Sequence, residues 1–215
     1  STGDWSSDVC SSDLYVIGKP VSALTMVMSK YLTNLSGANA GLLGIILGLM
    51  MAFDMGGPFN KAAYTFGVST LVAGHGSMIM AAVMAAGMTP PLGIALATVI
   101  AKKKFTSEER ESGKAAWALG ASFITEGAIP FAVADPLKII PSTMVGAAVA
   151  GALSMIFKAS IIAPHGGIFL LFIPHAVTNL VGYIIAIVAG TIVTGIMVKI
   201  LKKDVVVKNK INVEN

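Results

Sequence analysis

Long apolar runs, separated by short polar segments, dominate the pattern along the chain. They cover residues 38–53, 62–74, 77–88, 92–101, 115–134, 141–157, 161–173 and 176–200. Such lengths are typical of helices, and the run at 115–134 is about as long as a helix needs to be to cross a bilayer core. The period-two alternation that marks the strands of a membrane β-barrel is missing. The pattern therefore predicts an all-α membrane protein, a polytopic transmembrane helix bundle.

One carboxylate, Glu126, lies inside the apolar run at 115–134. A lone charge at membrane depth costs at least about 2–3 kcal/mol, so it needs a polar surrounding. Gly127 loosens a helix and Pro130 removes a backbone donor, so the run is expected to be broken. Broken backbone in a membrane is tolerated only inside protein or beside a water-filled cavity. Glu126 is therefore expected to face a polar cavity.

Basic clusters flank the last four runs and constrain their topology. Residues 102–114 hold a lysine-rich loop, and the C-terminal segment after residue 198 is also basic, so the positive-inside rule places both in the cytoplasm. The number of complete crossings between them is then even. The run at 161–173 is short and contains Pro164, His165 and two glycines. Two re-entrant hairpins, at 115–134 and 161–173, are the economical solution, although four full crossings are also even.

The segment between the first two runs combines helix breakers with polar side chains. Gly56, Gly57 and Pro58 end one helix, and Asn60 and Lys61 start the next. Asp54 and Lys61 either form a buried ion pair or line the cavity together with Asn60, and the two interpretations are compatible. Further along, residues 89–91 (Thr-Pro-Pro) are expected to end a helix before 92–101 begins another.

Composition narrows the function classes. The chain of 215 residues is 55% hydrophobic and 12% charged, whereas soluble domains carry about 25% charged residues. There is no basic patch interleaved with aromatic residues of the kind that binds nucleic acid. No phosphate-binding glycine-rich loop and no metal-ligand spacing occurs, so neither a metal nor a cofactor is expected. The single cysteine, Cys10, lies in a Ser/Asp-rich head at 1–14 that looks like a translated sequencing adapter.

Four separated motifs resemble signatures of one family in the expected order. They are residues 51–67 (MAFDMGGPFNKAAYTFG), 86–93 (AGMTPPLG), 123–131 (FITEGAIPF) and 163–169 (APHGGIF). Together they resemble the fructose-type IIC membrane component of the phosphoenolpyruvate-dependent sugar phosphotransferase system. The resemblance runs over about residues 19–203. It implies a bundle with two re-entrant hairpins, of which this chain looks like the C-terminal, substrate-binding part.

The resemblance also implies a function and partners. The implied function is that of a bacterial inner-membrane permease, acting as a homodimer, that passes fructose or a similar hexose or hexitol to a IIB phosphocysteine. The implied partners are the IIB domain and the IIA domain upstream of it, and the phosphoryl-carrying residue lies on another domain. On this interpretation residues 1–14 are a scar, 15–203 are a partial IIC domain and 204–215 are a polar cytoplasmic tail. Hydroxyl recognition by charged and amide groups makes Glu126 the candidate catalytic residue, with Asn60, Lys61, His165 and Asp54 as further sugar-binding candidates.

Two other classes fit parts of the pattern. Broken helices and an intramembrane carboxylate serve equally well in an ion-coupled secondary sugar transporter. A membrane scaffold without transport activity is the third class, and the unpaired-looking Glu126 argues against it for the parent protein but not for this chain taken as a fragment.

Overall fold

The computed structural model describes residues 40–71 and 75–205. The head at 1–14, the start of the segment 15–203 and most of the tail at 204–215 therefore lie outside the described residues. The elements in chain order are α3 (Ala40–Phe53), α4 (Pro58–Ser69), α5 (Met78–Ile100), η1 (Lys102–Lys104), α6 (Ser107–Ala121), η2 (Thr125–Ala128), α7 (Ile129–Ala134), α8 (Pro136–Ile156), β1 (Ser160–Ile161), η3 (Gly167–Phe172), β2 (Val177–Thr178) and α9 (Leu180–Leu201).

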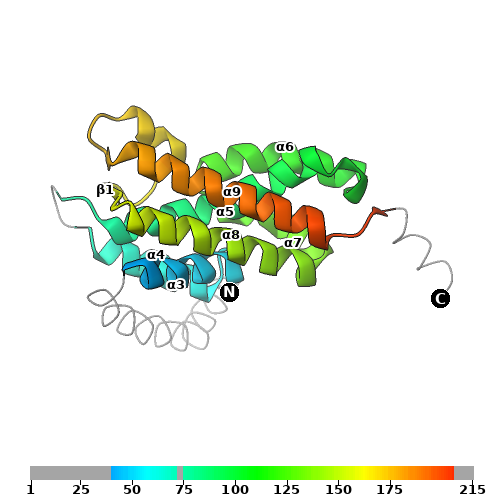
Figure 1. Cartoon of the computed structure of the whole chain (residues 1–215), viewed down its shortest axis with the longest axis horizontal. Helices are drawn as coiled ribbons and strands as arrows, with labels where there is room; N and C mark the ends of the chain where they lie inside the picture. Colours follow the sequence, from blue (N-terminus) through cyan, green and yellow to red (C-terminus); the bar gives the residue numbers. More distant parts are fainter. Residues whose placement is uncertain (1–39, 72–74, 206–215) are drawn as a thin grey trace, which may run out of the picture.

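The helices form a bundle around α5. Helix α5 packs against α3, α4, α6, α8 and α9, and α8 in turn packs between α3 and α9 (Figure 1). Within the described residues, α5, α8 and α9 are long and apolar enough to cross a membrane. The predicted all-α membrane helix bundle is thereby confirmed.

Glycines allow α3 and α8 to approach closely. A Cβ added to Gly44 would lie 2.6 Å from the carbonyl carbon of Gly151, and one added to Gly48 would lie 2.6 Å from that of Ala147. Both pairs are spaced by four residues, so they fall on the facing sides of the two helices. This is the small-residue packing that brings helix backbones together in membrane proteins.

The expected helix break at Thr89-Pro90-Pro91 is wrong, because α5 continues through both prolines. Prolines at these positions deprive two carbonyls of the preceding turn of their N–H donors. One of these two carbonyls finds another donor: Thr125 of η2 donates its hydroxyl to the Gly87 carbonyl over 2.9 Å. Packing of α5 against five helices holds its two halves in line.

Both runs predicted to be re-entrant are interrupted. The run at 115–134 is divided into the end of α6, the single turn η2 and the short α7. The break starts at Phe123, whose φ of +63° lies in the left-handed region, before the expected breakers Gly127 and Pro130. The run at 161–173 lies between β1 and β2, which pair antiparallel, and holds only η3. The entry and return of these segments on one side of a membrane stays a prediction.

The two basic clusters lie at the same end of the bundle. Lys202, at the end of α9, is 6% exposed; its ammonium group lies 2.6 Å from Glu109 and 4.3 Å from the centre of the Phe105 ring. Lys104 donates a hydrogen bond to the Lys202 carbonyl. Thr106 and Glu109 form a capping box at the start of α6, which fixes the loop between η1 and α6. The loop and the end of α9 are therefore held on one side.

Candidate functional site

Asp54 caps helix α4 from the preceding turn. Its two carboxylate oxygens accept hydrogen bonds from the backbone N–H groups of Phe59, over 2.7 Å, and Asn60, over 2.9 Å. These N–H groups have no partner within the helix, and the helix N-terminus favours a negative charge. Lys61 is exposed and forms no ion pair with Asp54. The ion-pair interpretation is therefore wrong, because the helix end already compensates the carboxylate.

Asn60 is buried and serves the same turn. Its side-chain Nδ2 donates to the carbonyl of Met51 over 2.7 Å, which ties the start of α4 to the end of α3. The turn between them holds Met55 and Gly56 at φ of +44° and +108°. Asp54 and Asn60 thus give the turn a defined shape and place Gly56 at its surface.

Glu126 lies against that turn. It belongs to η2, and a Cβ added to Gly56 would lie 2.6 Å from its Oε1 atom, so the carboxylate packs directly against the Gly56 backbone. Glu126 is exposed, and within the described part of the chain no hydrogen bond or ion pair to it is found. The carboxylate is therefore held next to the 54–61 segment with its oxygens free to accept hydrogen bonds.

Thr125 anchors the turn that carries Glu126. Its hydroxyl is buried and donates to the Gly87 carbonyl of α5. Pro91 stands four residues after Gly87 and has no N–H, so this carbonyl lacks its usual partner in the helix. The Pro-Pro sequence of α5 thus provides the acceptor that holds η2 in place.

Phe123 connects the remaining motif segments. Its buried ring lies 6.2 Å from that of Tyr64 on α4 and 5.3 Å from that of His165, measured between ring centres. A Cβ added to Gly87 would come within 3.0 Å of Phe123 Cδ2, so the glycine in α5 makes room for the ring. A bulky residue with positive φ is strained by about 1–3 kcal/mol and is often found at functional sites.

The segment around His165 packs on the backbone of the same break. Gly167 has φ of +54°, and a Cβ there would lie 2.8 Å from the carbonyl carbon of Ser122. His165 itself is exposed, and its ring lies against the Phe123 ring. The structure thus joins the segments 54–61, 123–131 and 163–169, which are far apart in the sequence.

The three joined segments carry polar groups of different kinds. Glu126 can accept hydrogen bonds, Lys61 can donate them, and His165 can do either; all three are exposed. Asp54 and Asn60 use their bonding capacity within the turn. No group of three or more histidine, cysteine, aspartate or glutamate side chains suited to a metal ion occurs among the described residues. Such a set of groups suits a neutral ligand with several hydroxyls.

Sequence reasoning missed the residues that hold the site together. Phe123, Thr125 and Gly87 were present in the motifs but carried no assigned role, and Gly56 was assigned only to a helix end. The adjacent Gly56 and Gly57 indicated a helix end without indicating that a carboxylate would pack there. The Pro-Pro pair at 90–91 was a signal for a free carbonyl at position 87, once the helix is known to continue.

Comparisons with known proteins give a consistent family. The chain is 59% identical over 89% of its length to the "PTS system fructose-specific EIIB'BC component" of Rhodobacter capsulatus. It is 49% identical over 89% of its length to the "Fructose permease IIC component" of Bacillus amyloliquefaciens, of which it covers 61%. It is 46% identical to the "PTS system fructose-specific EIIC component" of Haloferax volcanii, of which it covers 50%. No protein-family model and no solved structure matches the chain.

The chain spans about a third of the length of the EIIB'BC relatives, 33% for the protein of Rhodobacter capsulatus and 33% for that of Vibrio cholerae. The aligned region includes helices that are long and apolar enough to cross a membrane. Over about 89% of its length, the chain thus matches the C-terminal IIC region of fructose-specific components of the phosphotransferase system.

Proposed function

We propose that the chain is part of a permease that moves fructose across the inner membrane and presents it for phosphorylation by a IIB phosphocysteine. The observation that carries the proposal is the free carboxylate of Glu126, held beside Gly56 in a chain 49% identical to a fructose permease IIC component. Recognition of a polyol requires accessible hydrogen-bonding groups, which Glu126 and the segments joined to it supply.

In this function Glu126 is the catalytic residue. A sugar hydroxyl attacks phosphorus, an O–P bond forms, the S–P bond of the phosphocysteine breaks and the thiolate leaves. Glu126 accepts a hydrogen bond from the attacking hydroxyl and takes its proton. Because phosphoryl transfer depends mostly on positioning and on charge stabilisation, orienting this hydroxyl is the main contribution of the chain.

The other candidate residues bind sugar or support the site. Lys61 and His165 are exposed and donate to the remaining hydroxyls. Asp54 and Asn60, the remaining sugar-binding candidates, contribute indirectly, through the capped turn that they form. Thr125 acts as a positioning residue for Glu126.

The same proposal covers assembly and location. IIB and IIA act as partners, in line with relatives whose names combine the B and C or the A, B and C parts. The permease is a homodimer, the loop at 102–114 and the C-terminal end of α9 face the cytoplasm, and 15–203 is a partial IIC domain preceded by an adapter-like scar at 1–14. The contacts between Lys202 and the loop support a common side for both basic clusters.

The test separates sugar binding from phosphorylation in the membrane protein that carries this chain. With IIA and IIB present, Glu126→Gln should lower phosphoenolpyruvate-dependent fructose phosphorylation by roughly a hundredfold or more, the scale of a general base. Equilibrium fructose binding should fall much less, because the amide keeps one acceptor and adds a donor.

Asp204→Asn is the control, since it removes another exposed carboxylate near the end of α9. It should leave both quantities unchanged. Near-normal phosphorylation by Glu126→Gln would eliminate the catalytic role. Accumulation of free fructose under a proton gradient, without a phosphoryl donor, would contradict the phosphotransferase function and favour ion coupling.

A further inference from the structure

An apolar stripe on α5 and a stripe on α6 both lead to basic residues. On α5, Leu92, Leu96 and Val99 follow at intervals of three or four residues and share one face, and Lys102 follows in η1 just beyond the helix end. One face of α6, followed from its C-terminal end, carries Ala121, Trp117, Lys114 and Arg110 at the same intervals. The short connection through η1 makes the two helices run back against each other, so their basic ends lie together.

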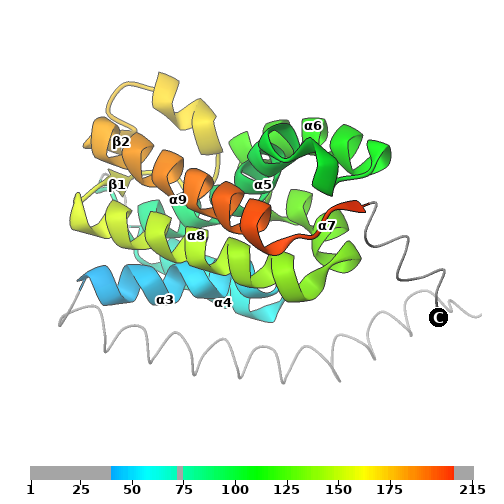
Figure 2. The same cartoon turned by 45° about the vertical axis from the view of Figure 1, so that its right-hand side comes forward.

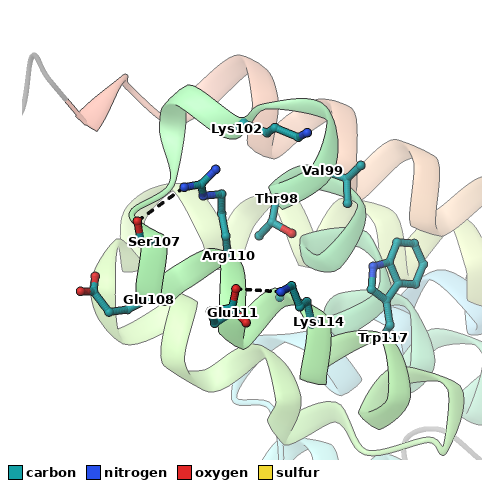
Figure 3. Close-up of a pocket in the computed structure, with 10 residues that line it drawn as sticks. Thr98, Val99, Lys102, Ser107, Glu108, Arg110, Glu111, Lys114 and Trp117 are labelled. Carbon is teal, nitrogen blue, oxygen red and sulfur yellow. Dashed lines mark hydrogen bonds and ion pairs between the residues drawn. The ribbon is translucent and has the colours of Figure 1, made fainter.

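A pocket of about 550 Å³ with charged side chains in its lining, the charged pocket, lies between these basic ends (Figure 3). Lys102, Arg110 and Lys114 line it together with the carboxylates of Glu108 and Glu111. Lys114 lies 2.7 Å from Glu111, and Arg110 donates to the hydroxyl of Ser107 over 3.5 Å. Figure 3 shows Trp117 on the same helix beyond Lys114. Cations outnumber carboxylates here, so the pocket favours an anion.

An apolar groove of about 450 Å³ continues from this pocket. It lies over α5 between α6 and α9, which flank α5 in Figure 2, and Leu96, Val188 and Ile192 line it. Trp117 lines both the groove and the charged pocket, so the two meet at this side chain. The groove follows α5 from Met88 to Leu96, about 12 Å at 1.5 Å per residue. That is less than half of a hydrocarbon core of about 30 Å, so the groove belongs to one leaflet.

We propose that this combined site binds one anionic phospholipid. Its phosphate lies among Lys102, Arg110 and Lys114, and an acyl chain lies in the groove beneath Trp117. A transmembrane protein helix would need an apolar surface about twice as deep. A free phosphate would use the charged pocket but not the groove. Tryptophan at the boundary is usual where a polar and an apolar environment meet, and basic pockets beside membrane helices suit anionic headgroups.

Quenching of Trp117 fluorescence by brominated lipid tests the site directly. The chain has two tryptophans, Trp5 and Trp117, so a Trp5→Phe background leaves one reporter. In detergent micelles, brominated phosphatidylglycerol should half-quench Trp117 at a mole fraction about tenfold lower than brominated phosphatidylcholine with the same chains. Unbrominated phosphatidylglycerol should reverse the quenching, and millimolar inorganic phosphate should not.

Two charge-matched double variants separate the site from the surface charge nearby. Arg110→Gln with Lys114→Gln removes two cations of the pocket and should abolish the preference for phosphatidylglycerol. Lys103→Gln with Lys199→Gln removes two neighbouring cations that do not line it and should keep the preference. Val188→Phe, at a groove position 48% exposed, should weaken quenching with all charges intact.

Three results would overturn the proposal. Equal quenching by the two lipids would mean ordinary contact with the surrounding lipid. An equal loss of the preference for phosphatidylglycerol in the two double variants would mean that surface charge alone attracts the lipid. Displacement by inorganic phosphate as effective as that by phosphatidylglycerol would assign the pocket to a free phosphate. These readouts involve neither fructose nor IIB, so they are independent of the proposed transport function.

Discussion

Replacing Thr125 by valine removes one hydroxyl from the contact between η2 and α5. The shape of the side chain is nearly unchanged, but the 2.9 Å hydrogen bond to the Gly87 carbonyl is lost. Pro91 cannot supply an N–H to that carbonyl, so the carbonyl is left without its helix donor in a buried place.

The expected loss of stability follows from these contacts. An unsatisfied buried acceptor costs about 1–3 kcal/mol, and hydrogen bonds between membrane helices contribute up to about 1.7 kcal/mol. The added methyl group of valine offsets a small part of this. We therefore expect the free energy of unfolding to fall by about 1–2 kcal/mol, measured by titrating the detergent-solubilised protein with sodium dodecyl sulphate.

Thr143→Val is the matched control for this loss. The Thr143 hydroxyl is also buried, and it donates to the carbonyls of Ile139 and Ile140 within α8. These carbonyls keep the N–H donors of their own helix, so Thr143→Val should lower the free energy of unfolding by less than about 0.5 kcal/mol. Thr125→Ser retains the hydroxyl and should recover most of the stability.

The same variant tests the positioning of Glu126. Without the anchor, η2 can move relative to Gly56, so fructose binding by Thr125→Val should weaken several-fold even under conditions in which the protein stays folded. Thr125→Ser should restore the binding. Equal unfolding free energies for Thr125→Val and Thr143→Val would refute the reasoning that Pro91 leaves the Gly87 carbonyl dependent on Thr125.

Two further predictions concern packing and topology. Gly48→Val places side-chain atoms on the backbone of Ala147, so it should lower the free energy of unfolding by about 2 kcal/mol or more. Ile45→Val, at an exposed position of α3, should change this free energy little. Similar values for the two variants would contradict the close contact of α3 and α8. In a Cys10→Ser background, Ser107→Cys should react with an impermeant maleimide only after the inner membrane is opened. Position 158 follows the C-terminal end of α8, at the end of the bundle opposite Lys202. Lys158→Cys should therefore react with the maleimide in cells with only the outer membrane permeabilised. The reverse labelling pattern would invert the proposed topology.

Much of the architecture could be predicted from local patterns. The apolar run that forms α9 could be predicted because the length of an apolar run is read directly from the sequence. The start of α6 could be predicted because the hydrogen bonds of a capping box join residues only three positions apart. The same reasoning failed at Pro90 and Pro91. Proline disfavours a helix locally, but a hydroxyl from a segment over thirty residues away and packing on all sides of α5 outweigh that cost.

The sequence by itself determined the membrane-helix class, the family resemblance and the candidate charged residues, of which Glu126 is the chief example. Only the tertiary structure decided which of them are free. It engages Asp54 and Asn60 in capping and joining helices, and it leaves Glu126 open beside Gly56. The physical reason is that a hydrogen-bonding group in a chain has many potential partners within reach. Its actual partner depends on which backbone donors and acceptors the helix ends, the prolines and the packing of distant segments have left unsatisfied.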